Sequence, residues 1–597
     1  MRTRGGYEQE IIQNEWQLAG VNFLRLVLLS LILGLIVTIV FFSLLAPKNS
    51  ISIAAYYYWS QLYCKIPFGC SAAAINNVRL LQPHMDSISG TLSACKYIFA
   101  FGTVAIGVGL RVFFRQQGKR LTEQKYLRGA KLLNPQELIA QIDRRYQETV
   151  FDLSVGLEKI RLPELLTFRH FLFAGVSGAG KTQGINKVLG QVEKKPAQKV
   201  FILDLNGQYY SRFGKPGDII LSLYDKRASA WDFWAEDAPP EFFAEALIEL
   251  DRNDKFFAPA GRALITDLLN RNSTISGLWK DLTAKPEKLL PKLEGGISPA
   301  LLGAPEQAAG VQASASLQLN FLRHLNHWSD SKPFTITDWC TNDSEDWVFL
   351  IVRDRDLAAS KPLLRVWFDL ATLGVLGRDE NKNYPHLWLI GDELPALGQL
   401  PTIGKLLSQG RKYRATVVAG YQTSGQIDAL YGHDAAKEIF AGLQNKFVFR
   451  CSDSETSKKL SLELGEQEVE EVGTSIQFGK MPQNDRNTLS RSVKTRPVVM
   501  PSEIQNLPDL HAYIKICDFD PTLIHFEYQD YPQINEPNCS QIPPLPTSDE
   551  EKPQQKPNNP SNNFSKPASD EADYDFDPEE SDEYDINPED SNDFLKF

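Results

Sequence analysis

The chain is poor in cysteine, with seven in 597 residues, and this scarcity limits what the protein can be. Four of the cysteines are scattered along the chain without CxxC or Cys/His ligand spacing, so we predict neither a zinc site nor a disulfide scaffold. These four are Cys340, Cys451, Cys517 and Cys539. Cys64 and Cys70 lie six positions apart, and the sequence leaves open whether they form a disulfide in an oxidising compartment or remain free thiols.

The chain also lacks an overall surplus of basic residues. Its net charge is −11, but residues 541–597 carry 16 acidic and 4 basic side chains, which leaves +1 for the preceding 540 residues. This acidic tail is rich in Pro, Asn and Ser and has few aliphatic residues, so it cannot bury a core and we predict that it is disordered. The near-neutral body gives no direct sign of DNA binding, because DNA-binding domains are usually basic.

Charged residues are missing from a long apolar run near the N-terminus. Residues 26–46 have no charged side chain over 21 residues, a length that crosses a hydrocarbon core of about 30 Å. A weaker second span covers 92–114, where Lys96 and Arg111 lie near the ends and can reach the interface. A cleaved signal peptide is the alternative for the first run, but such h-regions usually have only about 7–15 residues.

Lysine and arginine are distributed unequally around the second span. Seven occur within 111–131 and three within 47–90. This asymmetry places the segment after the second span in the cytoplasm and 47–90 in an extracytoplasmic loop. With two spans, both termini are then cytoplasmic. We therefore predict a membrane anchor over 1–114, followed by a basic linker over 115–165.

A glycine-rich motif follows this linker. The segment reads GVSGAGKT, which fits G-x-x-x-x-G-K-[ST], and lies between a predicted strand at 168–174 and a predicted helix at 183–192. Backbone N–H groups of such a P-loop surround phosphate. Lys181 would reach the β- and γ-phosphates, and Thr182 would ligate Mg²⁺. The residues predicted to bind the nucleotide are Gly175, Val176, Ser177, Gly178, Ala179, Gly180, Lys181 and Thr182.

A second motif supplies acidic residues. The apolar run 386–391 ends in Asp392 and Glu393, a pattern typical of Walker B. We predict that Asp392 holds Mg²⁺ through its water shell and that Glu393 accepts a proton from the attacking water. Because ligands bind at the carboxyl ends of parallel strands, both acids should lie beside Lys181 if the two strands are neighbours.

Two further residues are candidates for catalytic roles. Gln422 follows the apolar run 415–421 and would sense the γ-phosphate, or else face solvent. Arg411 would act as an arginine finger on a neighbouring subunit's nucleotide, or else stabilise a helix end. The guanine-specifying NKxD pattern is absent, which favours ATP over GTP.

Short apolar runs alternate with helical patterns on both sides of a helix-rich segment, which predicts an α/β fold with a mainly parallel sheet. We expect the nucleotide-binding domain to cover 166–239 and 326–535, interrupted by an all-α domain over 240–325. Further strands are predicted at 199–204, 219–223, 346–352 and 445–450, and helices at 135–144, 241–250, 260–271, 283–290 and 313–324.

Residues from about 168 to 515 resemble type IV coupling proteins of the TraD/TrwB class, which are hexameric, FtsK-related ATPases of the inner membrane. Beyond the two Walker motifs, the matching segments are 204–207, 230–234, 332–339, 391–397, 409–412, 418–424, 464–469 and 501–510. The resemblance implies a RecA-like P-loop NTPase with ATP and Mg²⁺ as cofactors. It also implies a homo-hexamer whose partners are single-stranded DNA, a relaxase and the type IV secretion channel.

The acidic tail resembles that of the TraD-like proteins only in composition and position. It would dock a relaxosome accessory protein, or else only increase solubility. The leading hypothesis is an inner-membrane ATPase that recruits the relaxosome and pumps single-stranded DNA with its relaxase into the channel during conjugation. The alternative is a coupling protein that delivers effector proteins without DNA. A septal pump for double-stranded DNA is disfavoured by the two spans and the disordered tail.

Overall fold

The computed structural model describes residues 4–66, 70–122, 125–146, 151–155, 158–250, 254–325, 332–477 and 486–541. The predicted acidic tail lies outside these residues, apart from Gln541. Two helices near the N-terminus, α1 (Arg4–Leu45) and α3 (Ala72–Thr122), include segments long and apolar enough to cross a membrane. These segments, Phe23–Leu45 and Ala72–Gln116, overlap the predicted spans at 26–46 and 92–114.

The described residues of the predicted extracytoplasmic loop, 47–90, are mostly helical. They contain α2 (Ser50–Lys65) and the first part of α3. Tyr57 of α2 donates a hydrogen bond to Gln82 of α3, with 2.8 Å between the two oxygens. Buried apolar side chains of α1, α2 and α3 form a small core of their own. Hydropathy and charge counting detect runs of membrane length, so they predicted neither α2 nor the first part of α3. Cys64 and Cys70 are free thiols.

The central sheet has nine strands in the order β14-β13-β10-β4-β9-β8-β5-β7-β6. The seven strands from β10 to β6 run parallel. β13 pairs antiparallel with both β10 and β14, so it is the one reversed strand of this sheet within the described residues, and the prediction of a mainly parallel α/β sheet is confirmed. In chain order the strands are β4 (Phe171–Ala174), β5 (Gln198–Leu205), β6 (Ile219–Leu221), β7 (Val348–Val352), β8 (His386–Gly391), β9 (Ala415–Tyr421), β10 (Asn445–Val448), β13 (His511–Ile516) and β14 (Thr522–His525).

Both faces of this sheet are covered, as expected for parallel strands with apolar residues on each side. Alternate residues of β5 belong to two different cores: Val200 and Ile202 to one, Phe201 and Leu203 to the other. The first core includes α4 (Pro135–Arg145) and α6 (Lys181–Val192). The second includes α15 (Leu357–Leu376), α16 (Ile403–Gln409) and α18 (His433–Gly442).

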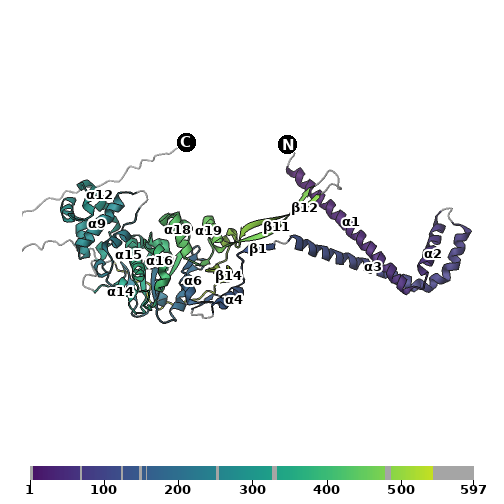
Figure 1. The fold of residues 1–597 in the computed structure, drawn as a ribbon, viewed down its shortest axis with the longest axis horizontal. Helices are drawn as coiled ribbons and strands as arrows, with labels where there is room; N and C mark the ends of the chain where they lie inside the picture. The colour runs from purple at the N-terminus through teal and green to yellow at the C-terminus, as the bar shows by residue number, and fades with distance from the viewer. Residues whose placement is uncertain are drawn as a thin grey trace, which may run out of the picture. The chain divides into compact units, whose positions relative to one another are not determined.

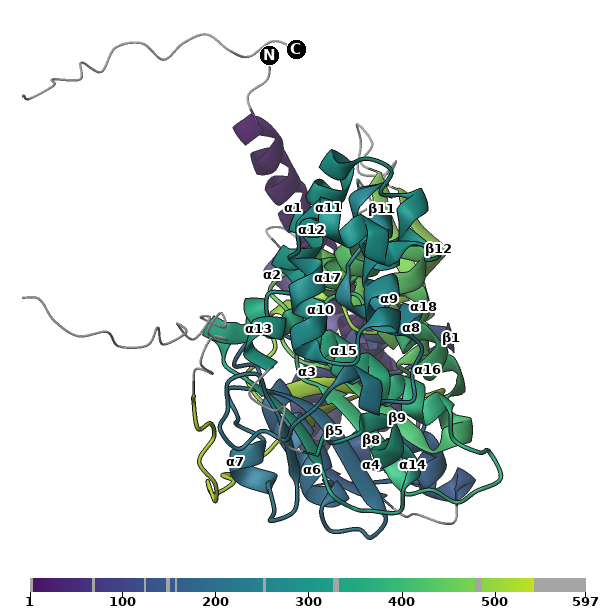
Figure 2. The ribbon, with the colours of Figure 1, turned by 90° about the vertical axis from the view of Figure 1, so that its left-hand side faces the viewer.

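Between β6 and β7 the described residues from 222 to 347 contain helices and no strand. Four of these helices lie together in Figure 2: α8 (Pro240–Leu247), α9 (Phe257–Arg271), α10 (Ile275–Leu282) and α12 (Pro305–Gln318). The helix predicted at 283–290 is found only from Pro286, as α11 (Pro286–Leu289). Thr274 accepts a hydrogen bond from the Gly277 N–H and starts α10 earlier, and the chain begins a new short helix at Pro286.

A second sheet, absent from the sequence prediction, is a long hairpin with a third strand added. The hairpin consists of β11 (Glu466–Gln477) and β12 (Arg486–Pro497), and β1 (Lys125–Gly129) pairs with β11 (Figure 1). Ion pairs connect its strands, including Arg128–Glu468 and Lys494–Glu471, each at 2.7 Å. Because β1 belongs to the predicted linker 115–165, this pairing attaches part of the linker to the hairpin.

After β14 the chain continues as an extended strap, residues 527–541. Its main-chain N–H at Ile534 donates to the carbonyl of Ser211 at 2.7 Å, and the N–H of Lys226 donates to the carbonyl of Cys539 at 2.9 Å. Tyr531 packs its ring against Phe213. The strap therefore covers the loop that follows β5 before the chain enters the tail.

Candidate nucleotide-binding site

The predicted P-loop joins the end of β4 to the start of α6. Gly178 and Gly180 have φ values of +80° and +118°, a region that L side chains rarely adopt. A Cβ at Gly178 would have no atom within 4 Å, so the inner side of the loop is open space. Lys181 is buried and donates from Nζ to the carbonyl of Gly175 at 2.6 Å. The loop therefore holds a cation and the free N–H groups of a helix N-terminus beside an open cavity.

The acids lie beside the P-loop, although their strands are not neighbours. Strand β9 separates β4 from β8. The sequence prediction required these two strands to be neighbours, and they are not. Contact occurs because the chain after β8 crosses over β9 at Gly420, where a Cβ would lie 1.9 Å from the carbonyl oxygen of Asp392. Thr182 then donates from Oγ1 to Oδ2 of Asp392 at 3.0 Å. The two predicted Mg²⁺ residues are in direct contact.

Gln422 lies at the end of β9 and reaches the second acid. Its Nε2 donates to Oε2 of Glu393 at 3.0 Å. Burial raises the pKa of Glu393, while the hydrogen bond from Gln422 and the charge of Lys181 act in the opposite direction. A carboxylate with a raised pKa accepts a proton more readily than an exposed one, as a general base requires.

These residues line a cavity of about 650 Å³ that opens to solvent. Six of the eight P-loop residues line it, together with Asp392, Glu393 and Gln422, whereas Gly175 and Ala179 do not. The six are Val176, Ser177, Gly178, Gly180, Lys181 and Thr182. The cavity is also lined by Asp509, Leu510 and Tyr528, which sequence reasoning did not connect with the site; the Leu510 N–H donates to the carbonyl of Ala179 in the P-loop at 2.9 Å.

The oxygens of the two acids fit a hydrated metal ion. Oδ1 of Asp392 and Oε1 of Glu393 are buried and have no hydrogen-bond partner within the described residues. Buried carboxylate oxygens without partners are costly unless a ligand or ordered water satisfies them. Together with the Thr182 hydroxyl they offer the oxygen ligands that Mg²⁺ prefers.

Two more residues belong to this site and were missed as functional residues. Tyr209 is fully buried and donates from its hydroxyl to Oδ2 of Asp392 at 2.7 Å. Asp204, at the end of β5, accepts hydrogen bonds from the N–H groups of Tyr209 and Tyr210 at 3.0 and 2.7 Å. Burial raises the pKa of Asp204 to about 7. An acid at the carboxyl end of a strand followed by Asn-Gly was the signal available in the sequence.

Arg411 lies apart from the site of its own chain. It is exposed in a short 3₁₀ helix, Gly410–Tyr413, immediately before β9. Gln422 follows the other end of the same seven-residue strand, so the two ends are about 20 Å apart at ~3.3 Å per residue. The structure brings Lys181, Thr182, Asp392 and Glu393 together, but not Arg411.

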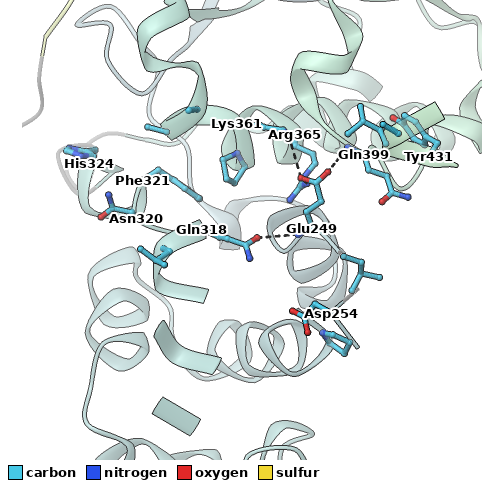
Figure 3. A pocket seen from close by; sticks show the side chains of 18 of the residues that line it. Glu249, Asp254, Gln318, Asn320, Phe321, His324, Lys361, Arg365, Gln399 and Tyr431 are labelled. Carbon is cyan, nitrogen blue, oxygen red and sulfur yellow. Dashed lines mark hydrogen bonds and ion pairs between the residues drawn. The ribbon is translucent and has the colours of Figure 1, made fainter. Parts of the chain in front are cut away.

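A second and larger cavity, of about 1100 Å³, lies between the helical segment and helices α15 and α17 (Ser424–Tyr431) (Figure 3). Glu249 projects into it between Lys361 and Arg365, at 3.6 and 3.2 Å. The Gln399 N–H donates to the same carboxylate at 3.4 Å. The cations are thus already matched by an acid, and this cavity does not resemble a phosphate site.

The sheet and the cavity define a RecA-like P-loop protein. The family model described as the type IV secretion-system coupling protein DNA-binding domain matches residues 155–526, and the chain belongs to this family. It is 28% identical to the coupling protein TraD of Escherichia coli (strain K12) over 460 residues, which are 72% of this chain and 63% of TraD. The match thus spans less than two thirds of TraD.

Solved structures of a coupling protein have the same fold. TrwB in complex with ADP and Mg²⁺ is 26% identical, covers 70% of this chain and 97% of its own, and has a TM-score of 0.60. TrwB in complex with the non-hydrolysable ATP analogue ADPNP is 25% identical, covers 70% of this chain and 98% of its own, and has the same TM-score. The resemblance noted in the sequence is confirmed at the level of the family.

Proposed function

We propose that the chain is a membrane-anchored ATPase that couples a DNA substrate to a type IV secretion channel. It would recruit the relaxosome and drive single-stranded DNA, with its attached relaxase, into the channel during conjugation. The observation that carries the proposal is the contact of Thr182 with Asp392 beside Lys181, in a chain of the coupling-protein family. The nucleotide complexes of the related TrwB support ATP and Mg²⁺ as the ligands of this cavity.

The side chains suggest how hydrolysis proceeds. The P-loop N–H groups and Lys181 would bind the phosphates, and Thr182 and Asp392 would hold Mg²⁺, which would neutralise charge on the transferred phosphoryl group. Glu393, with its raised pKa, accepts the proton of the attacking water. Gln422 orients that carboxylate through its hydrogen bond and responds to the γ-phosphate. The bond from Lys181 to the Gly175 carbonyl would give way to the phosphates.

The assembly and location belong to the same proposal. Six copies would form a ring in which Arg411 of one subunit reaches the nucleotide of the next, because Arg411 is remote from the site of its own chain. The two apolar helices support an inner-membrane anchor with both termini in the cytoplasm. The domains would follow the predicted bounds, with the all-α domain at 240–325 and the acidic tail docking a relaxosome accessory protein.

The test uses the full chain in detergent, measuring ATP hydrolysis with and without single-stranded DNA. We expect stimulation by DNA and its loss in Lys181→Ala, which removes the phosphate-binding cation. Lys187→Ala, a change in the same helix outside the motif, is the matched control and should remain active. Hydrolysis that persists in Lys181→Ala would contradict the motor assignment.

Delivery of effector proteins without DNA is the second candidate. The near-neutral charge of the body favours it, because a DNA channel is usually basic. Crosslinking in cells during transfer separates the two candidates. Recovery of DNA attached to this chain supports the first, and recovery of protein substrates alone supports the second.

A further inference from the structure

Tyr209 is the only residue outside the two Walker motifs that contacts Asp392 through a side-chain hydrogen bond, within the described part of the chain. Its ring is fully buried, and its hydroxyl lies 2.7 Å from Oδ2 of Asp392. Thr182 donates to the same oxygen at 3.0 Å. Two hydroxyl groups from different elements therefore converge on one carboxylate oxygen.

This convergence determines which way the carboxylate faces. Turning the carboxylate plane about the Cβ–Cγ bond would move an oxygen away from both donors and break two hydrogen bonds, and the other oxygen position has no partner among the described residues. Hydrogen bonds to ionised groups are stronger than those between neutral groups, so the observed orientation is favoured. Oδ1 is then the oxygen left available for water in the metal shell.

The loop that carries Tyr209 is fixed from two sides. On the inner side, Asp204 accepts from the N–H groups of Tyr209 and Tyr210. On the outer side, the strap passes so close that a Cβ at Gly207 would lie 1.8 Å from the carbonyl oxygen of Pro537. A ring held in this way presents its hydroxyl at one place, as a support for a metal ligand must.

We propose that Tyr209 is a positioning residue for Asp392 and sets how strongly Mg²⁺ binds together with the nucleotide. The proposal rests on the Mg²⁺–nucleotide site assigned above and extends it to a residue that lies in neither Walker motif. Although Tyr209 lines the cavity, its hydroxyl donates to Asp392, so it acts through the carboxylate. Its effect should therefore appear only when the metal is present.

The experiment measures the affinity of the full chain for ADP by titration calorimetry, once with Mg²⁺ and once with EDTA. Tyr209→Phe keeps the ring and removes only the hydroxyl. We expect the gain in ADP affinity on adding Mg²⁺ to fall about tenfold in this variant, the usual loss when a metal ligand loses its support. The affinity in EDTA should stay within about twofold of the unchanged chain, because the phosphate contacts are intact.

Tyr210→Phe is the matched control, since Tyr210 is the next residue, at the start of α7 (Tyr210–Phe213), and its ring packs on Phe349. It should match the unchanged chain in both conditions. Equal gains from Mg²⁺ in Tyr209→Phe and the unchanged chain would overturn the proposal, and so would an equal loss of affinity in both conditions. Failure of the unchanged chain to bind ADP at all would overturn the proposed function and this inference together.

Discussion

Gln422 and Glu393 are joined by a hydrogen bond of 3.0 Å, although 29 residues separate them in the chain. The bond links the ends of two adjacent strands, β8 and β9, at the edge of the sheet where the P-loop also lies. The amide of Gln422 donates to the carboxylate and therefore favours its ionised form. Burial acts in the opposite direction and raises the pKa of Glu393 above that of an exposed glutamate.

The first prediction concerns the pH dependence of hydrolysis. If Glu393 must be ionised to accept a proton, activity falls as the pH decreases through its raised pKa. Gln422→Ala removes a donor that lowers this pKa, so the acidic limb of the rate profile should move to higher pH. The measurement is kcat for ATP between pH 5 and 9. An acidic limb at the same pH in both proteins would contradict the role assigned to the pair.

The second prediction concerns the shape of the P-loop. Gly178 has φ +80°, and an alanine there costs about 1–2 kcal/mol of backbone strain. We expect Gly178→Ala to weaken ADP binding by about tenfold, since 1.4 kcal/mol corresponds to that factor. Gly404→Ala in α16, where a Cβ also meets no atom within 4 Å, is the control and should bind normally. Unchanged binding by Gly178→Ala would show that the loop tolerates another backbone conformation.

How far the sequence predicted this site can be judged residue by residue. The P-loop, Asp392 and Glu393 were found because phosphate and metal chemistry require particular residue types at fixed spacing. Tyr209 was missed because a buried tyrosine has no such spacing, and its contact with Asp392 depends on how β5 and β8 are paired. The crossing of the chain after β8 over Gly420 of β9 could not be predicted either, because it depends on the order of the strands in the sheet, which the sequence does not specify.

The strands also divide into those that the sequence predicted and those that it missed. Apolar runs at 386–391 and 415–421 matched strands closely, since a parallel strand buried on both faces is apolar throughout. The strand predicted from 168 begins only at Phe171, because His170 has φ +56° and interrupts it. The hairpin at 466–497 was missed, since it is held by ion pairs and main-chain bonds and has no regular apolar alternation.

The third prediction concerns Asp204 and stability. Burial raises its pKa in the folded chain to about 7, whereas an unfolded aspartate titrates near 3.8. The folded state thus binds more protons between these values, and the contribution of this group to stability decreases as the pH rises from about 4 to 7. We therefore compare the thermal midpoint of Asp204→Asn with that of the unchanged chain at each pH. The difference, variant minus unchanged chain, should be more positive at pH 8 than at pH 5. Asp343→Asn, an exposed acid, should show no such trend.

The fourth prediction tests whether Arg411 acts between subunits. Arg411 and Gln422 flank opposite ends of β9, so Arg411 cannot reach the nucleotide of its own chain. Arg411→Ala and Lys181→Ala should each be inactive alone. A mixture of the two should regain ATP hydrolysis, because some interfaces then combine an intact Lys181 with an intact Arg411. Mixing Lys181→Ala with Glu393→Gln is the control and should regain nothing, as both changes damage the same site. Failure of the first mixture would count against the finger.

The last prediction compares two cations that share one carboxylate in the larger cavity. Arg365 is almost fully buried, and its guanidinium donates to the last carbonyls of α8, including that of Leu247 at 2.8 Å, as well as pairing with Glu249. Lys361 is about one third exposed and pairs with Glu249 alone, at 3.6 Å. Glu249 is itself about one third exposed, so the two cations differ mainly in the carbonyls that Arg365 satisfies. Leaving a buried acceptor unpaired costs about 1–3 kcal/mol, whereas an exposed ion pair contributes about 0–1 kcal/mol.

We therefore expect Arg365→Met to lower the unfolding free energy by several times more than Lys361→Met, as measured by urea denaturation of the full chain. Arg365→Met should also speed proteolytic cleavage within the described helices from α8 to α12, because α8 loses the guanidinium that holds its end against α15. Equal effects of the two substitutions would mean that Glu249, rather than the end of α8, is what Arg365 stabilises. A double change, Arg365→Met with Glu249→Leu, distinguishes these cases, since it restores stability only if the unpaired carboxylate causes the loss.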